Sequence, residues 1–145
     1  AGQRVPRIRS MSMNNWVGGP SWSSSGNGWK VYTKDSDRTA PGPSQTFVLI
    51  DEREDSINDG YFVVDMQGFP DRGASWKIVD YPASYHNGAA TFAFADGHSE
   101  IHRWTNPRTI PSLSKSNIPL NVPSPNNEDV LWMQERSTRL INAVR

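Results

Sequence analysis

The sequence predicts a single α+β domain that is mainly antiparallel β, with a short-stranded sheet, long loops and one C-terminal helix. Three observations support this expectation. A chain of 145 residues can bury one modest core and is too short for two ordinary domains. Short apolar or alternating runs are separated by Gly, Pro, Asn and Asp, which is typical of antiparallel strands joined by loops. Helix-capping signals occur near the C-terminus, over residues 127–141.

Residues 1–27 lack hydrophobic periodicity, and we expect a loop-rich N-terminal segment there. Short runs of apolar, aromatic and β-branched residues follow, each bounded by turn-forming residues or prolines. They predict four strands, at residues 29–34, 46–50, 61–66 and 76–81.

A hairpin is predicted next, within the stretch YHNGAATFAFADGHSEIHRW at residues 85–104. Large and small residues alternate over 91–95, as expected for a half-buried strand, and Asp96-Gly97 predicts a two-residue type I′ turn. That turn pairs Phe92 with Ile101. It therefore places Phe92, Phe94 and Ile101 on the core face, and it places His98, Glu100 and His102 on a solvated face.

A proline-punctuated, irregular segment separates the hairpin from the predicted helix. Asn127 is a favourable helix N-cap. Glu128 and Asp129 fall in the first turn and Arg136 lies further along, in keeping with the helix dipole. We expect Trp132 to pack on the sheet.

The composition excludes several classes of function. Fifteen basic and fifteen acidic residues leave no net charge, so we expect no nucleic-acid partner. The absence of cysteine excludes disulfides, thiolate zinc sites and a cysteine nucleophile. No run of eighteen apolar residues is present, so no membrane segment is expected, and the start AGQRVPRIRS has no signal-peptide profile. We expect a soluble fragment or a mature form.

The histidines raise the question of a metal or catalytic site. His86 and Asp96 flank a predicted strand, which separates them by about 20 Å and argues against a hydrogen-bonded dyad. His98 and His102 lie roughly 13 Å apart on one strand, too far to bind one zinc ion together. A metal-dependent hydrolase around His86, Asp96 and His98 is the weaker hypothesis. The alternative is that these residues belong to two turns, one at each end of a strand.

Asp55, Asn58 and Asp59 are hard oxygen donors, and we consider them a calcium site. The loop is not an EF-hand, because Ile57 occupies its third position and Met66 its twelfth. The alternative is that Asp, Asn, Ser and Gly simply favour turns. Calcium is the one cofactor that the sequence proposes.

No catalytic residue is assigned, and the sequence favours a protein that is not an enzyme. Asp51 and Glu52 are adjacent on a predicted strand, so their side chains point to opposite faces and do not form a glycosidase pair. The nucleophile-elbow motif G-x-S-x-G does not occur.

Three tryptophans in loop-like surroundings are candidate binding residues: Trp16, Trp22 and Trp29. Flat aromatic rings on loops stack on sugars and also form hot spots between proteins. Alternatively, each ring fills a small core beneath its own loop.

The spacing of His86, nine residues and Asp96-Gly97 reproduces the pattern that names the prepilin-type H-X9-DG proteins, which are pseudopilin-like. Other blocks resemble the same family in the same order, so the resemblance runs from about residue 10 to about residue 140. These blocks are SMSMNNWVGG, PSQTFVLIDE, DSINDGYF, PASYHNGAATFAFADGHSEIHRW and DVLWMQERST.

The resemblance implies a pilin-like head whose antiparallel sheet packs on an N-terminal helix. It implies a type II secretion or type IV pilus-like role, a periplasmic or extracellular location, and partners among pilin or pseudopilin subunits or secretion-system proteins. The type III signal and apolar N-terminal helix of that family are not found in this sequence. Our first hypothesis is a non-enzymatic structural head; the second is a secreted domain that binds or acts on polysaccharide through its loop tryptophans.

Overall fold

The computed structural model describes residues 10–19 and 28–142. Within these residues the chain forms short strands, three single-turn 3₁₀ helices and one α-helix. The elements are β1 (Met11–Asn14), η1 (Asp35–Asp37), η2 (Pro43–Gln45), β2 (Phe47–Asp51), β3 (Tyr61–Phe62), η3 (Gly73–Ser75), β4 (Lys77–Ile78), β5 (Ala89–Phe94), β6 (Ser99–Arg103), β7 (Val122–Pro123) and α1 (Glu128–Glu135).

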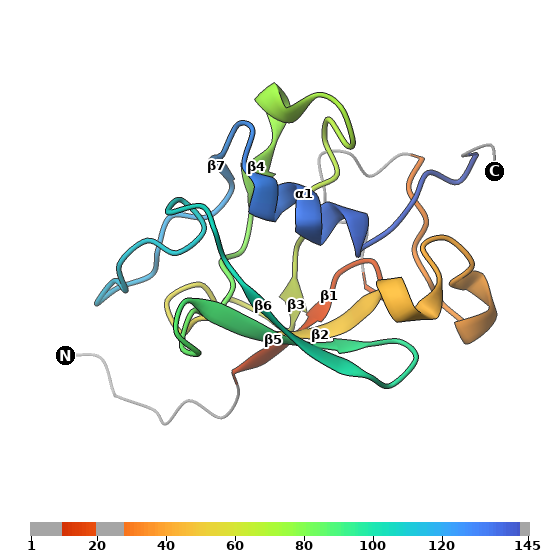
Figure 1. The fold of residues 1–145 in the computed structure, drawn as a ribbon, viewed down its shortest axis with the longest axis horizontal. Coiled ribbons are helices and arrows are strands. Elements are labelled where there is room, and N and C mark those ends of the chain that lie inside the picture. The colour runs from red at the N-terminus through yellow and green to blue at the C-terminus, as the bar shows by residue number, and fades with distance from the viewer. Residues whose placement is uncertain (1–9, 20–27, 143–145) are drawn as a thin grey trace.

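Five strands form one sheet in the order β3-β1-β2-β5-β6, and every neighbouring pair is antiparallel except β1 and β3. Helix α1 lies over one face of this sheet, and the small antiparallel sheet of β4 and β7 lies beyond α1 (Figure 1). The predicted class, α+β with a mainly antiparallel sheet and a C-terminal helix, is confirmed.

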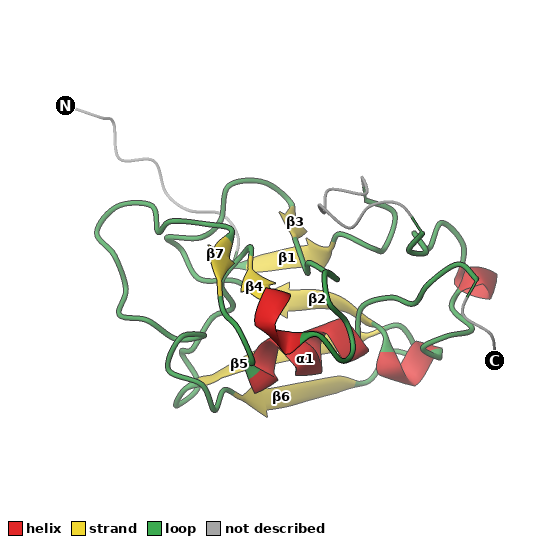
Figure 2. Cartoon of the chain, turned by 90° about the horizontal axis from the view of Figure 1, so that it is seen from above, coloured by secondary structure: helices red, strands yellow, loops and turns green. Residues whose placement is uncertain are grey.

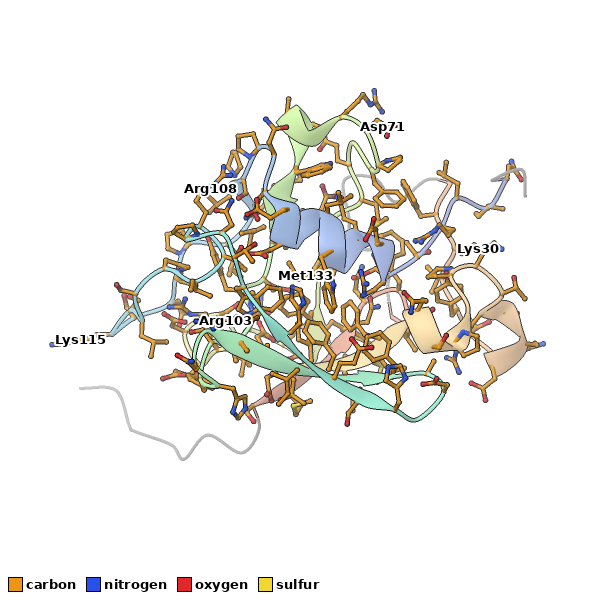
Figure 3. The ribbon with its side chains drawn as sticks, viewed as in Figure 1. Lys30, Asp71, Arg103, Arg108, Lys115 and Met133 are labelled. Atoms are coloured by element: carbon orange, nitrogen blue, oxygen red, sulfur yellow. The ribbon has the colours of Figure 1, made fainter. Side chains whose placement is uncertain are left out.

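The core has two parts, one on each side of α1. The larger lies between α1 and the five-stranded sheet, and it includes Met133 of α1 (Figure 3) and Phe92 of β5. The smaller joins α1 to the β4–β7 sheet through Val130, Trp76 and Ile78. Helix α1 therefore buries side chains on both of its sides. This packing stabilises a helix of eight residues, which is too short to be stable on its own.

Strand β1 was not expected from the sequence, because its pattern is reversed. The polar residues Ser12 and Asn14 are buried, whereas Met13 between them is 37% exposed. Asn14 is satisfied by its surroundings: its Nδ2 donates to the Phe47 carbonyl, and its Oδ1 accepts the Trp16 N–H. The alternation of methionine with polar residues is present, but it assigns the polar residues to the solvent face, which is the reverse of what the structure shows.

The predicted register of the β5–β6 hairpin is wrong by one residue. Gly97 has φ +95°, whereas Asp96 is not in the positive-φ region, and the loop contains three residues, 95–97, closed by Phe94 and His98. This is the geometry of a type I turn followed by a glycine bulge. The two-residue turn lies instead at Asn87-Gly88, where both φ angles are positive.

The shifted register pairs Phe92 with Glu100 and Thr91 with Ile101. Because a one-residue slip moves every side chain of a strand to the other face, Ile101 points away from α1 and is 68% exposed. His98, Glu100 and His102 consequently lie on the α1 side of the sheet, which corrects the solvated face expected for them.

Other expected elements are shorter than predicted. Residues 29–34 make only isolated bridges within the described chain, and 61–66 and 76–81 keep two strand residues each. The run after β3 leaves the sheet because side chains replace its strand partner: Val63 N–H donates to Asp80 and Val64 N–H to Asn15.

Helix α1 ends at Glu135 rather than at residue 141. The Arg136 and Ser137 N–H groups donate to the carbonyls three residues earlier, and the Thr138 hydroxyl donates to the Lys30 carbonyl. No helix among the described residues is long and apolar enough to cross a bilayer.

Candidate functional site

The two ends of β5 hold the residues that the H-X9-DG pattern singles out, and they do not meet. His86 comes directly before the Asn87-Gly88 turn that leads into β5. Its Nε2 lies 3.6 Å from Asp51 Oδ2 and its side chain is half exposed. Asp96 lies in the loop after β5, and a strand of this length separates the two by about 20 Å. The block therefore encodes two chain reversals around a strand rather than a dyad.

Asp96 and Glu100 hold the His98 imidazole between them. Nδ1 lies 2.5 Å from Asp96 Oδ1, and Nε2 lies 2.9 Å from Glu100 Oε1. The Glu100 and Asp96 hydrogen bonds raise the pKa of His98, and the His98 hydrogen bonds lower the pKa of Asp96. The imidazole also stacks on the Phe94 ring, with the two ring centroids 4.4 Å apart. Both ring nitrogens are engaged, so this arrangement fixes the hairpin loop.

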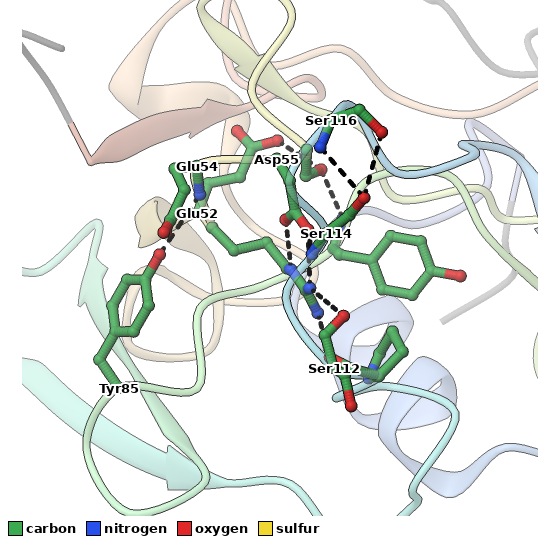
Figure 4. A network of polar contacts seen from close by, with 11 residues as sticks. Glu52, Glu54, Asp55, Tyr85, Ser112, Ser114 and Ser116 are labelled. Atoms are coloured by element: carbon green, nitrogen blue, oxygen red, sulfur yellow. Dashed lines mark hydrogen bonds and ion pairs between the residues drawn. The ribbon is translucent and has the colours of Figure 1, made fainter. Parts of the chain in front are cut away.

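The loop that was considered for calcium is organised by Arg53, which is 1% exposed. Its Nε and one NH2 group bond the two carboxylate oxygens of Asp55 at 2.5 and 2.8 Å, and its guanidinium also donates to the Pro111 and Ser112 carbonyls (Figure 4). Burial alone favours neutral Asp55, but the Arg53 and Ser114 hydrogen bonds lower its pKa. Arg53 thereby ties two loops distant in the sequence.

The three calcium candidates are not brought together. Asp55 is buried against Arg53, whereas Asn58 and Asp59 are exposed and Asp59 accepts the Tyr61 N–H as a turn residue does. The residues that the structure describes contain no cluster of three His, Cys, Asp or Glu side chains able to hold a metal ion.

Two buried carboxyl groups were not recognised in the sequence. Glu52 is 1% exposed at the end of β2, and burial, with Asp80 and Asp59 nearby, raises its pKa to about 7. Asp80 is 3% exposed, and burial raises its pKa to about 7 as well. Ser56 Oγ donates to Glu52 Oε1, while Glu52 Oε2 has no hydrogen-bond partner among the described residues.

The sequence gives little indication that Glu52 and Asp80 are buried. Glu52 follows the apolar run of β2 at a position that often faces solvent, whereas in the fold it forms a bridge with Pro82 and is buried. Asp80 is one of many acids in turn-like positions, and nothing in its neighbours marks it as buried.

The tryptophans do not form a binding surface in the described chain. Trp16 is fully buried and its Nε1 donates to the Val64 carbonyl, and Trp29 is 9% exposed with its ring against Phe69. Both belong to the main core, so neither ring is free to stack on a sugar. Trp22 lies outside the described residues.

An open depression of about 600 Å³ lies beside η3. Its charged lining residues are Asp71 and Arg72, with neutral polar neighbours, and it brings none of the candidate site residues together. It offers no paired acid and base.

The most distinctive surface is the sheet face opposite α1, which we call the outer face. Strand alternation and the observed register place these apolar or small residues on it: Met11, Met13, Leu49, Tyr61, Thr91, Ala93 and Ile101. Met13, Leu49 and Ile101 are 37, 36 and 68% exposed. Asp51, Ser99 and Arg103 add a polar border.

Among known proteins, no family model, no curated protein and no solved structure matches this chain.

Proposed function

We propose that this chain is the non-enzymatic head of a pilin-like protein of the cell envelope, acting through protein–protein contacts. The observation that carries the proposal is the outer face: all five strands contribute exposed or partly exposed apolar side chains to one continuous surface. Contiguous exposed apolar surface of this kind is typical of sites that contact another protein or a membrane.

The sequence resemblance supports the same proposal from another side. A pilin-like head packs its sheet on an N-terminal helix, and the outer face is the face that α1 leaves free (Figure 1). An apolar helix seated there would cover Met13 and Leu49, which face each other across β1 and β2.

The polar residues of the H-X9-DG block support a structural role too. Asp96 and Glu100 are occupied by His98, and Asp51 accepts the Thr91 N–H while facing His86. Each of these groups stabilises a turn or a strand end. A role in holding the fold together is therefore sufficient to explain these polar residues.

A photo-crosslinking amino acid tests the proposal in the native host, with the complete gene product. Placed at Leu49, it should form crosslinks to an apolar helix, either of the same chain or of another pilin-type subunit. Placed at Leu113, which is 52% exposed on the loop between β6 and β7 rather than on the outer face, it should not. Equal crosslinking from both positions, or polysaccharide as the sole partner of the Leu49 probe, would overturn the proposal.

A further inference from the structure

Strand β6 forms a free edge of the five-stranded sheet (Figure 2). It is five residues long, whereas β3 at the opposite edge has two. A long exposed edge is a template for pairing with another strand, and proteins usually shorten or cover it. Here Ser99, Glu100, Ile101 and Arg103 are all exposed.

The hydrogen-bonding direction of β6 follows from its register. Phe94 N–H donates to the His98 carbonyl, and Trp104 N–H donates to the Gly88 carbonyl. Antiparallel pairs alternate, so the even-numbered residues of β6 face β5. The N–H and C=O groups of Ser99, Ile101 and Arg103 therefore point away from the sheet, and they have no partner among the described residues.

The sequence of β6, Ser-Glu-Ile-His-Arg, is complementary to itself when it runs antiparallel. With Ile101 opposite Ile101 of a second copy, Ser99 lies opposite Arg103 and Glu100 lies opposite His102. The three outward-pointing residues then pair only with outward-pointing residues, and each such pair exchanges two N–H···O bonds.

We infer that β6 pairs antiparallel with β6 of a second copy of this chain, around a two-fold axis at Ile101. This isologous contact joins the two sheets into one continuous sheet. It also removes the two Ile101 side chains from water, because they lie side by side on the outer face.

Glu100 and Ile101 favour this register over its neighbours. A shift of two residues in one direction places Glu100 opposite Glu100, and so does a parallel arrangement in register. Like charges directly opposite are destabilising. A shift of two residues in the other direction places Ile101 opposite Arg103, so the two isoleucine side chains no longer pair.

The contact is independent of the proposed function. It uses the edge of the sheet rather than the region around Leu49, so the crosslinking experiment at Leu49 and the experiments below can fail separately.

Single cysteines test the geometry, because the chain has no cysteine of its own. Opposed residues of a hydrogen-bonded antiparallel pair have Cα atoms about 5.5 Å apart, within the range of a disulfide. Under mild oxidation Ile101→Cys should give a covalent dimer on a non-reducing gel. Ser99→Cys alone should not, since its two copies lie roughly 13 Å apart. Mixing Ser99→Cys with Arg103→Cys should restore the dimer.

Leu113→Cys is the control for chance collisions, because Leu113 is similarly exposed and lies on a loop. Covalent dimers of Ile101→Cys that form no faster than those of Leu113→Cys or Ser99→Cys would overturn the inference.

Sedimentation of the unaltered chain provides a second measurement. A reversible dimer should appear between about 10 µM and about 1 mM, the range of weak edge contacts. Ile101→Pro should abolish it while the near-UV circular dichroism is unchanged, because the lost N–H points away from β5 and proline is tolerated on an edge. A dimer that survives Ile101→Pro, or a chain that stays monomeric throughout, would contradict the inference.

Discussion

The imidazole of His102 lies flat on the indole of Trp132, with ring centroids 3.7 Å apart and planes 14° apart. His102 belongs to the edge strand β6 and Trp132 to α1, so this stack attaches the edge of the sheet to the helix. The Arg136 guanidinium lies 4.1 Å from the centroid of the same indole, and the edge of Phe92 approaches it from the sheet.

We predict that His102→Ala lowers the free energy of unfolding by about 1–3 kcal/mol, because it removes the stack and leaves Trp132 partly uncovered. Arg103→Ala, on the same strand but exposed, should change it by less than about 0.5 kcal/mol. Urea unfolding at pH 7.5 measures both. Equal effects of the two substitutions would show that the stack does not hold β6 to α1.

His102→Phe separates stacking from ionisation. Burial lowers the pKa of His102 in the folded chain, so the folded state favours the neutral ring. The stability that the neutral, stacked ring contributes is therefore fully present above the unfolded pKa, near 6.5, and is lost as the pH falls below that value. His102→Phe should match the wild type at pH 7.5 and exceed it in stability at pH 5. Parallel stability profiles over this range would contradict the expectation.

The hairpin shows how much a sequence reveals. Both turns and both strands were predicted from Asn-Gly, Asp-Gly and the alternation between them. The register was not, because Asp-Gly suits two loop lengths: a two-residue turn with positive φ at both residues, and a three-residue loop with positive φ at glycine alone. The choice between them decides which face every β6 side chain occupies, and the Trp132 stack favours the observed one.

The candidate site was harder to predict than the fold. The grouping of Arg53 with Asp55, Pro111 and Ser112 joins positions almost sixty residues apart. Short-range patterns carry no information about such contacts. They did show correctly that His86 and Asp96 are kept apart, because that conclusion needs only the length of one strand.

The backbone at Gly97 provides the next prediction. A Cβ there would meet no atom within 4 Å, but φ +95° is strained for any residue other than glycine. Gly97→Ala should therefore lower the free energy of unfolding by about 1–2 kcal/mol. Gly42→Ala is the matched control, since Gly42 has equal space and no positive φ, and it should be neutral or slightly stabilising. Thermal unfolding of both variants checks the difference, and a neutral Gly97→Ala would disprove the assigned turn.

Arg53 provides a fourth prediction. Arg53→Met keeps most of the volume of the side chain but removes the donors to the Pro111 and Ser112 carbonyls. It also leaves the buried Asp55 carboxylate with the Ser114 N–H but no cation. We expect a loss of about 3–5 kcal/mol. Trypsin should also cleave after exposed Lys115 faster, because the loop carrying it is released. Adding Asp55→Asn should recover part of the stability, since it removes the unpaired charge. A loss below about 1 kcal/mol would mean that other contacts hold the two loops together.

The buried acids Glu52 and Asp80 make stability depend on pH in the direction opposite to His102. Burial raises both pKa values to about 7, above their usual values of 4.5 and 3.8. The stabilisation is complete at acid pH and is lost as the pH rises from about 4 to about 7. Glu52→Gln should therefore raise the free energy of unfolding at pH 8 by on the order of 1–3 kcal/mol and flatten this part of the profile. Its effect at pH 4 should be small.

Glu54→Gln, two residues along and less buried, is the control and should leave the profile unchanged. The double variant Glu52→Gln with Asp80→Asn should gain less than the sum of the two single variants, because each removes part of the repulsion felt by the other. A destabilising effect of Glu52→Gln at pH 8 would contradict this prediction, because it would show that the ionised carboxylate is not the unfavourable group.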